Sequence, residues 1–209
     1  MDLPSRDERA AGIRRTLVTI ALEIVIGFVG VYAAFALSAY HERRDLDERR
    51  HQIRLALIDE IREIKRGTGS AAIGVGKWVA YYDSATKAGS SPPLEPFLTS
   101  ERFDTHMWNA TQQAGGLMLL DVPTYSRLSE YYNELARGFD EIDRLRTRSE
   151  TVLLPNLGKP VDEYYSAPGK IRMKYVWYPV GMQRLRRIAL DVNQQSDPLI
   201  ALLQRADAH

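Results

Sequence analysis

A long apolar run near the N-terminus constrains this chain more than any other feature. Residues 16–40 read TLVTIALEIVIGFVGVYAAFALSAY, and the only charged residue among them is Glu23. A helix that crosses a bilayer needs about 20 mostly apolar residues, and a longer run is accommodated by tilting. We therefore predict one transmembrane helix over residues 16–40, preceded by an N-terminal tail over residues 1–15. No later stretch is long and apolar enough to span again.

A cleaved signal peptide is the alternative interpretation of the same run. Arg14 and Arg15 would supply its basic start, and Ala34-Phe35-Ala36 resembles a cleavage site of small residues. The apolar region of a signal peptide is, however, only about 7–15 residues long. The length of the run and the charge of Glu23 within it favour the anchor.

One face of the predicted span carries small residues and the glutamate. At 100° per residue, the stripe falls within roughly 80° of arc, and it consists of Glu23, Gly27, Gly30, Ala34 and Ser38. Small residues at this spacing let two helices approach closely, and a carboxyl group in lipid is costly without a partner. The face predicts association with a second copy or with another membrane protein. In the alternative, Glu23 reaches the headgroups near Arg15.

The rest of the chain has helical periodicity. Residues 41–66 contain no Pro or Gly and predict an amphipathic stalk helix with a narrow stripe of Leu46, Ile53, Leu57, Ile61 and Ile64. The sequence Gly67-Thr68-Gly69-Ser70 is expected to end this helix. Residues 67–209 are then predicted to form a helical soluble domain, so the fold class is all-α: a transmembrane helix, a stalk helix and an antiparallel bundle.

Five further helices are expected in the soluble domain. The first four cover residues 70–87, a segment that begins at Ser100 and ends at Gly115-Gly116, a long amphipathic helix from Pro123 to about Pro155, and residues 171–192. Pro123 suits the first turn of its helix. Asp197 and Pro198 predict the N-cap and first turn of a last short helix over residues 199–205.

No motif points to catalysis. Gly67 to Lys77 (GTGSAAIGVGK) lacks the spacing of a phosphate-binding loop, and Trp78 stands where a Ser or Thr would ligate magnesium. The four histidines do not form a metal motif, the chain has no cysteine, and a net charge of +1 gives no basic footprint for nucleic acid. We expect no cofactor, no metal, no nucleic acid partner and no enzymatic activity.

Aromatic residues are frequent in the soluble part. Two interpretations stay open: they fill the core of the bundle, or they line a pocket for a small molecule or peptide. The pocket candidates are Trp78, Tyr82, Trp108, Tyr131 and Tyr132.

The layout resembles a loose group of bacterial single-pass membrane proteins. The features that resemble the group are the Arg-containing tail, the Glu-bearing span, the charged helix that begins Tyr40-His41-Glu42-Arg43-Arg44, then Trp108, Gly116-Leu117 and residues 128–132. The resemblance implies the bacterial inner membrane and a single pass, and no activity is attached to the group. Arginines flank the span almost equally, which only slightly favours a periplasmic soluble domain.

These features together predict a membrane-anchored helical protein that acts by protein–protein interaction, as a scaffold, assembly factor or regulator. Its predicted partners are the lipid bilayer and either a second copy or another membrane protein. The alternative is a sensor-like domain that binds a small molecule or peptide in an aromatic-lined pocket.

Overall fold

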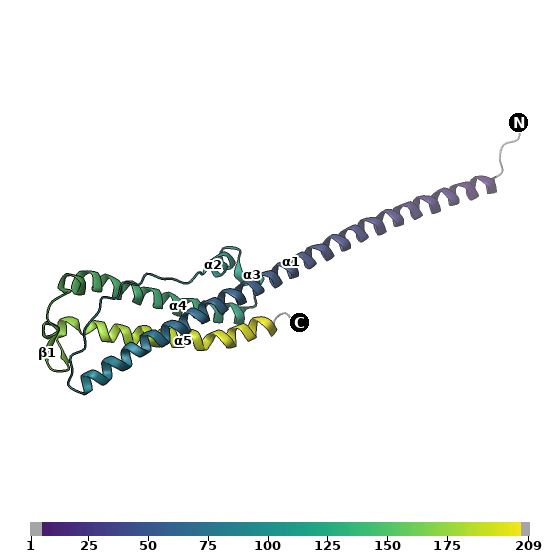
Figure 1. Cartoon of the computed structure of the whole chain (residues 1–209). Helices are drawn as coiled ribbons and strands as arrows, with labels where there is room; N and C mark the ends of the chain where they lie inside the picture. Colours follow the sequence, from purple (N-terminus) through teal and green to yellow (C-terminus); the bar gives the residue numbers. More distant parts are fainter. Residues whose placement is uncertain (1–5, 206–209) are drawn as a thin grey trace. The chain divides into compact units, whose positions relative to one another are not determined.

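The computed structural model is mostly helical, which confirms the all-α expectation (Figure 1). It describes the backbone of residues 6–205 and the side chains of residues 28, 30–116 and 119–205. The chain divides into two compact units, residues 1–49 and residues 50–209. Helix α1 (Arg6–Lys87) contributes residues to both units.

The predicted membrane anchor gains no support from the structure. Among the residues that could be searched, no helix combines the length and the apolar character needed to cross a membrane. Most of the predicted span lies outside that search, because the side chains of residues 16–27 and 29 are not among those described.

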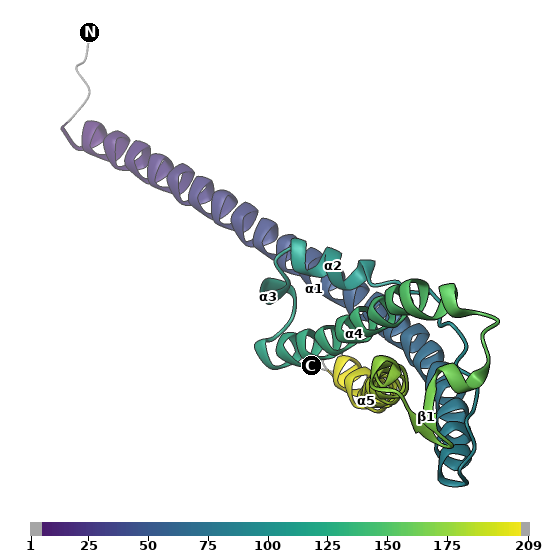
Figure 2. The same cartoon turned by 90° about the vertical axis from the view of Figure 1, so that its left-hand side faces the viewer.

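The unit of residues 50–209 is built on three long helical segments. These are residues 50–87 of α1, helix α4 (Val122–Arg148) and helix α5 (Trp177–Arg205). Figures 1 and 2 show α4 and α5 side by side, running in opposite directions, with α1 packed against them. The short helices α2 (His106–Gln113) and α3 (Gly116–Leu119) precede α4.

The connection from α4 to α5 holds the remaining regular structure. Helix α4 runs into a π-helix over Ser149–Leu153 and a 3-10 turn over Leu154–Asn156. Further 3-10 turns cover Val161–Glu163 and Met173–Tyr175. Between them, strands β1 (Tyr165–Ala167) and β2 (Lys170–Ile171) pair as an antiparallel hairpin. This small sheet was not predicted, because five residues carry too little pattern to identify a strand.

Two clusters of buried side chains form the core of this unit. The first joins Leu57, Ile61 and Ile64 of α1 to Leu128 and Tyr131 of α4 and to the second half of α5. The second lies toward the end of α1 and the start of α5. The stripe predicted over residues 41–66 therefore faces the core from Ile53 onward, whereas Leu46 is exposed.

The predicted helix end at Gly67-Thr68-Gly69-Ser70 is wrong. Helix α1 continues through these residues to Lys87, so the stalk helix and the separate helix over residues 70–87 are one element. Each glycine costs a helix about 1 kcal/mol relative to alanine. Tertiary packing offsets that cost at Gly67, where a Cβ atom would overlap the ring of Phe103.

The predicted break at Asp197-Pro198 is also wrong. Helix α5 continues with Pro198 in its interior, and Asp197 forms an ion pair with Lys65 of α1, with 2.7 Å between Nζ and Oδ2. Leu199 and Leu203, which follow the proline, are buried in the first cluster. Their burial keeps the chain helical at a proline that removes one backbone hydrogen bond.

The start of α4 agrees with its prediction. The side chain of Asp121 accepts a hydrogen bond from the backbone N–H of Thr124 at 2.9 Å, and a proline stands in the first turn. Backbone and side-chain hydrogen bonds from Thr124 lower the pKa of the Asp121 carboxyl. Local capping chemistry thus defines this helix start without tertiary help.

Candidate functional site

A mostly apolar cavity of about 440 Å³, open to solvent along one side, lies in the unit of residues 50–209. Helices α1, α4 and α5 form its walls, and the loop between α1 and α2 contributes Phe97, Thr99, Glu101 and Phe103. The lining of α4 and α5 is aliphatic or aromatic, apart from a single glycine in α4. Pockets of roughly 300–1,000 Å³ with mostly apolar walls are typical small-molecule sites.

Small residues of α1 create the space. Gly67, Ala71 and Gly74 line the cavity and recur at spacings of four and three residues, so they share one face of the helix. At Gly74, nothing lies within 4 Å of where a Cβ atom would stand. The stretch that superficially resembles a phosphate loop is therefore helical, and its small residues leave room between helices.

The loop over the cavity is fixed at both ends. On one side, the N–H of Phe97 donates to Oγ of Ser149 at 3.0 Å, and the hydroxyl of Tyr178 donates to the carbonyl oxygen of Glu95 at 2.5 Å. On the other side, Arg102 forms an ion pair with Asp143 and lies 5.6 Å from the centroid of the Phe139 ring. These contacts hold the loop residues that line the cavity close to α4, to the π-helix that follows it, and to α5.

Glu60 anchors the segment that follows the loop. Its carboxylate accepts hydrogen bonds from the hydroxyl of Tyr132 at 2.6 Å and from the backbone N–H groups of Met107 at 2.8 Å and Trp108 at 3.3 Å. The negative charge thus lies at the N-terminus of α2, where helix dipole and free N–H groups favour it. Burial and the hydrogen bond to Glu60 raise the pKa of the Tyr132 hydroxyl.

The five aromatic residues predicted as a possible pocket do not form one. Trp108, Tyr131 and Tyr132 belong to the first core cluster, whereas Tyr82 is buried in the second and Trp78 packs against it. Trp108 stacks on Tyr132 with 4.9 Å between ring centroids, and Trp78 stacks on Tyr82 at 5.0 Å. The rings fill the core, and none of the five lines the 440 Å³ cavity.

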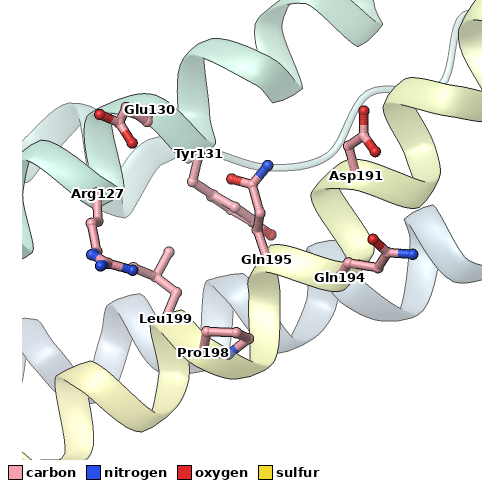
Figure 3. Close-up of a pocket in the computed structure, with 8 residues that line it drawn as sticks. All are labelled: Arg127, Glu130, Tyr131, Asp191, Gln194, Gln195, Pro198 and Leu199. Atoms are coloured by element: carbon pink, nitrogen blue, oxygen red, sulfur yellow. The ribbon is translucent and has the colours of Figure 1, made fainter.

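A second, more polar depression of about 290 Å³ lies between α4 and α5 (Figure 3). Arg127, Glu130 and Tyr131 come from α4, and Asp191, Gln194 and Gln195 from α5. The Tyr131 hydroxyl is 3.1 Å from Oγ of Ser196, which itself donates to the carbonyl oxygen of Val192. Most of the other lining side chains are exposed, so this depression is an open surface feature.

The predicted helix-association face is only partly described. Gly30, Ala34 and Ser38 lie on α1 and are exposed, whereas Glu23 and Gly27 lie outside the residues with described side chains. Large apolar side chains in the same segment are also exposed, among them Phe28, Tyr32 and Phe35 at 75%, 77% and 71%.

The residues of the cavity were missed by the sequence analysis. Phe97 stands in a loop without periodicity. The spacing placed Phe103 near the start of a helix that begins at Ser100, whereas α2 begins only at His106. The available signal was the recurrence of Gly67, Ala71 and Gly74 on one helical face, which we read as a turn.

Comparisons with known proteins leave the geometry as the only guide to function. No family model matches the chain, and no similar curated protein or solved structure was found. Among the side chains that the structure describes, no group of three or more His, Cys, Asp or Glu residues is arranged to hold a metal ion.

Proposed function

We propose that this protein is a membrane-tethered, non-enzymatic helical protein that acts by contact with a second copy or with another membrane protein. The tether is the run of residues 16–40, and the contact face is the stripe of Glu23, Gly27, Gly30, Ala34 and Ser38. The membrane is the bacterial inner membrane, with the unit of residues 50–209 on its periplasmic side.

One observation carries this proposal. Every described side chain between residues 28 and 49 is exposed, including Phe28, Tyr32 and Phe35. Exposed apolar groups of this size and density mark a surface for lipid or for another protein. An isolated helix gains little stability from its own backbone, because most helical stability in proteins comes from packing. A bilayer with a partner helix supplies that packing.

The small residues indicate where a partner helix would lie. Gly30, Ala34 and Ser38 share one face, and Phe28 and Tyr32 lie on the opposite side of the helix. In lipid, close backbone approach at small residues drives association, while large apolar groups face acyl chains. A protonated Glu23 on the same face would gain a hydrogen bond across the interface.

The test uses full-length protein in its native membrane. The protein is crosslinked through its lysines, because it has no cysteine. Mass spectrometry of the crosslinked species then identifies a second copy or a discrete partner. Gly30→Leu combined with Ala34→Leu is expected to abolish the crosslinked species, because both changes block close approach. Phe28→Leu combined with Tyr32→Leu, on the opposite face, is the matched control and leaves the species intact.

Three outcomes contradict the proposal in separable ways. If alkaline carbonate releases the wild-type protein from the membrane, residues 16–40 are not a membrane tether. If the crosslinked species is unchanged in the Gly30 and Ala34 variant, the stripe is not the contact face. Equal loss in both double variants shows that any change in this segment disrupts the protein, so the stripe has no special part.

Small-molecule binding is the second candidate function. The aromatic pocket that would have supported it is not formed, but the 440 Å³ apolar cavity is a different place for a ligand. Apolar walls of this kind favour the apolar part of a ligand, and the exposed lining residues leave a way in from solvent. Titration of the full-length protein with alkyl alcohols tests this candidate.

A further inference from the structure

We propose that the cavity between α1, α4 and α5 binds a single hydrocarbon chain whose polar end is cationic and lies beside Glu101. This inference rests on the ligand-binding candidate above and is independent of the membrane tether and its contact face. It assigns the ligand class and its orientation.

The size and shape of the cavity fit a chain. At about 440 Å³ it has roughly three times the volume of the engineered apolar cavity that accepts benzene. Its lining runs from Gly67 to Val75 on α1, from Leu135 to Ile142 on α4, and from Leu185 to Val192 on α5. Each stretch covers about two helical turns, or roughly 11 Å. An elongated apolar group uses such a space better than a compact ring.

The chemistry of the walls excludes a polar ligand body. The hydroxyl of Thr68, the buried polar group of the lining, already donates to the carbonyl oxygen of Ile64 at 2.8 Å. The other polar lining side chains are the exposed Ser70, Thr99 and Glu101. A ligand inside the cavity therefore finds apolar contacts, and its polar end belongs at the exposed edge, where water and these three groups are available.

Glu101 determines the sign of that polar end. Within the described part of the chain, no basic side chain forms an ion pair with Glu101, whereas the neighbouring Arg102 is paired with Asp143. Lys65 and Arg66, which precede the lining residue Gly67, are paired with Asp197 and Glu63. Phe103 adds an aromatic ring to the same edge, and a carboxylate with aromatic rings favours a cation.

The opposite end of the cavity offers the alternative that the experiment must separate. The side chain of Arg186 lies against Gly76. Gly76 is nine residues beyond Gly67 on α1, so it lies roughly 14 Å farther along the helix. An anionic head would be drawn to Arg186 and would place the chain in the reverse direction.

The experiment is photolabelling of the full-length protein in native membranes with a diazirine-bearing decylamine. Mass spectrometry locates the label, and competition by unlabelled compounds gives relative affinities. We expect label in residues 71–75, 97–103 and 135–142. Label in residues 16–40 reports partitioning into lipid and serves as the internal reference.

Two series of competitors define the ligand class. Among alkylamines of increasing length, affinity is expected to rise about fourfold per methylene until the cavity is full, and then to level off. At ten carbons, decylamine is expected to compete best and decanoate worst, with decanol between them. The affinities of decylamine and decanol, and of decanol and decanoate, are each expected to differ by at most about fivefold, because the Glu101 carboxylate is exposed to water.

Gly74 offers a variant that fills the cavity without a clash. Gly74→Leu is expected to abolish labelling at the cavity while leaving the label in residues 16–40, because open space surrounds the position of its Cβ atom. Gly74→Ala is the matched control. It raises the helix propensity at this position as the leucine does, but it leaves most of the cavity volume and most of the labelling. Thermal unfolding verifies that both variants fold.

Two charge variants test the orientation. Glu101→Gln is expected to remove the preference for decylamine over decanol, and Arg186→Gln is expected to leave it unchanged. A preference for decanoate that disappears in Arg186→Gln overturns the cationic class and reverses the chain. Failure of every compound to label the cavity, or equal labelling of Gly74→Leu and wild type, overturns ligand binding there altogether. Neither result bears on the crosslinking test of the tether.

Discussion

The two parts of helix α1 have the same secondary structure and opposite surroundings. Between residues 28 and 49 every described side chain is exposed, with Phe35 at 71%. Between residues 50 and 87, Leu57 and Ile61 are fully buried against α4 and α5. Helix propensity alone does not distinguish these parts. The difference teaches that tertiary packing, rather than the helix itself, decides which apolar stripe becomes a core.

The largest expected effect contrasts two positions of one predicted stripe. Ile61→Ala is expected to cost about 2–5 kcal/mol of unfolding free energy, because it opens a cavity at a fully buried position. Leu46→Ala, at a side chain that is 43% exposed, is expected to change it by less than about 0.5 kcal/mol. Urea unfolding followed by circular dichroism measures both. If both variants lost the same unfolding free energy, the contrast between the two parts of α1 would be wrong, because Leu46 would then be packed against another part of the protein.

Alkaline pH is expected to act on the buried part alone. Burial raises the pKa of the Tyr131 hydroxyl to about 12, whereas an unfolded tyrosine titrates near 10. The unfolded chain therefore loses this proton first. Its contribution to stability is complete below about pH 10 and falls as the pH rises through about 12, by up to roughly 3 kcal/mol.

Tyr131→Phe is expected to weaken that alkaline loss, as measured by urea unfolding at a series of pH values. Tyr40→Phe, in the exposed part of α1, is the matched control and is expected to keep the wild-type dependence. If both variants behaved alike, the alkaline loss would come from another group.

Glu60 and Glu42 extend the comparison between the packed and exposed parts of α1 to a polar side chain. Glu60→Ala removes the acceptor of the Tyr132 hydroxyl and of two backbone N–H groups, so about 1–3 kcal/mol of stability is expected to be lost. Glu42→Ala makes the same change at an exposed position of the same helix and is expected to have little effect. A double-mutant cycle with Tyr132→Phe measures how much of the loss comes from that hydrogen bond. Additive losses would show that the bond contributes nothing.

The smallest expected effect concerns the cap of α4. Asp121→Ala is expected to cost about 1 kcal/mol, because it removes the acceptor for the N–H of Thr124. Since hydrogen bonds lower the pKa of this carboxyl, its contribution is present above about pH 4 and is lost as the pH falls through the lowered value. Asp121→Asn keeps an acceptor and is expected to lose less, without that acid dependence. Urea unfolding at neutral and acid pH distinguishes these outcomes.

Local signals predicted the elements whose ends are fixed by local chemistry. Asp121 and Pro123 begin α4, and the stripe of Leu128, Tyr131 and Leu135 faces the core as its spacing indicates. The helix expected over residues 70–87 also ends where it was predicted, since α1 ends at Lys87. Proline and capping side chains act through atoms only a few residues away, so sequence alone reveals them.

The candidate site depended on contacts between residues far apart in the chain. The ring of Phe103 packs against Gly67, which is 36 residues earlier in the sequence. The carboxylate of Glu60 accepts a hydrogen bond from the N–H of Met107 in α2, 47 residues later. The same long-range contacts kept α1 helical at the glycines that we predicted as its end. The aromatic residues were considered as a possible pocket but fill the core. A ring that fills a core and a ring that lines a pocket have the same sequence pattern, so the sequence could not distinguish them.

Periodicity and capping are local properties of the chain, and they were enough to predict that this protein is helical, where α4 begins, and which stripe of α1 can enter a core. Long-range packing was needed to show that α1 passes unbroken through its glycines and that α5 passes through Pro198. It also showed that the five aromatic residues predicted as a pocket fill the core, while Gly74 and Phe103 help to line the cavity. Those outcomes depend on packing energies of several kcal/mol between distant residues, which exceed the roughly 1 kcal/mol of a local glycine preference.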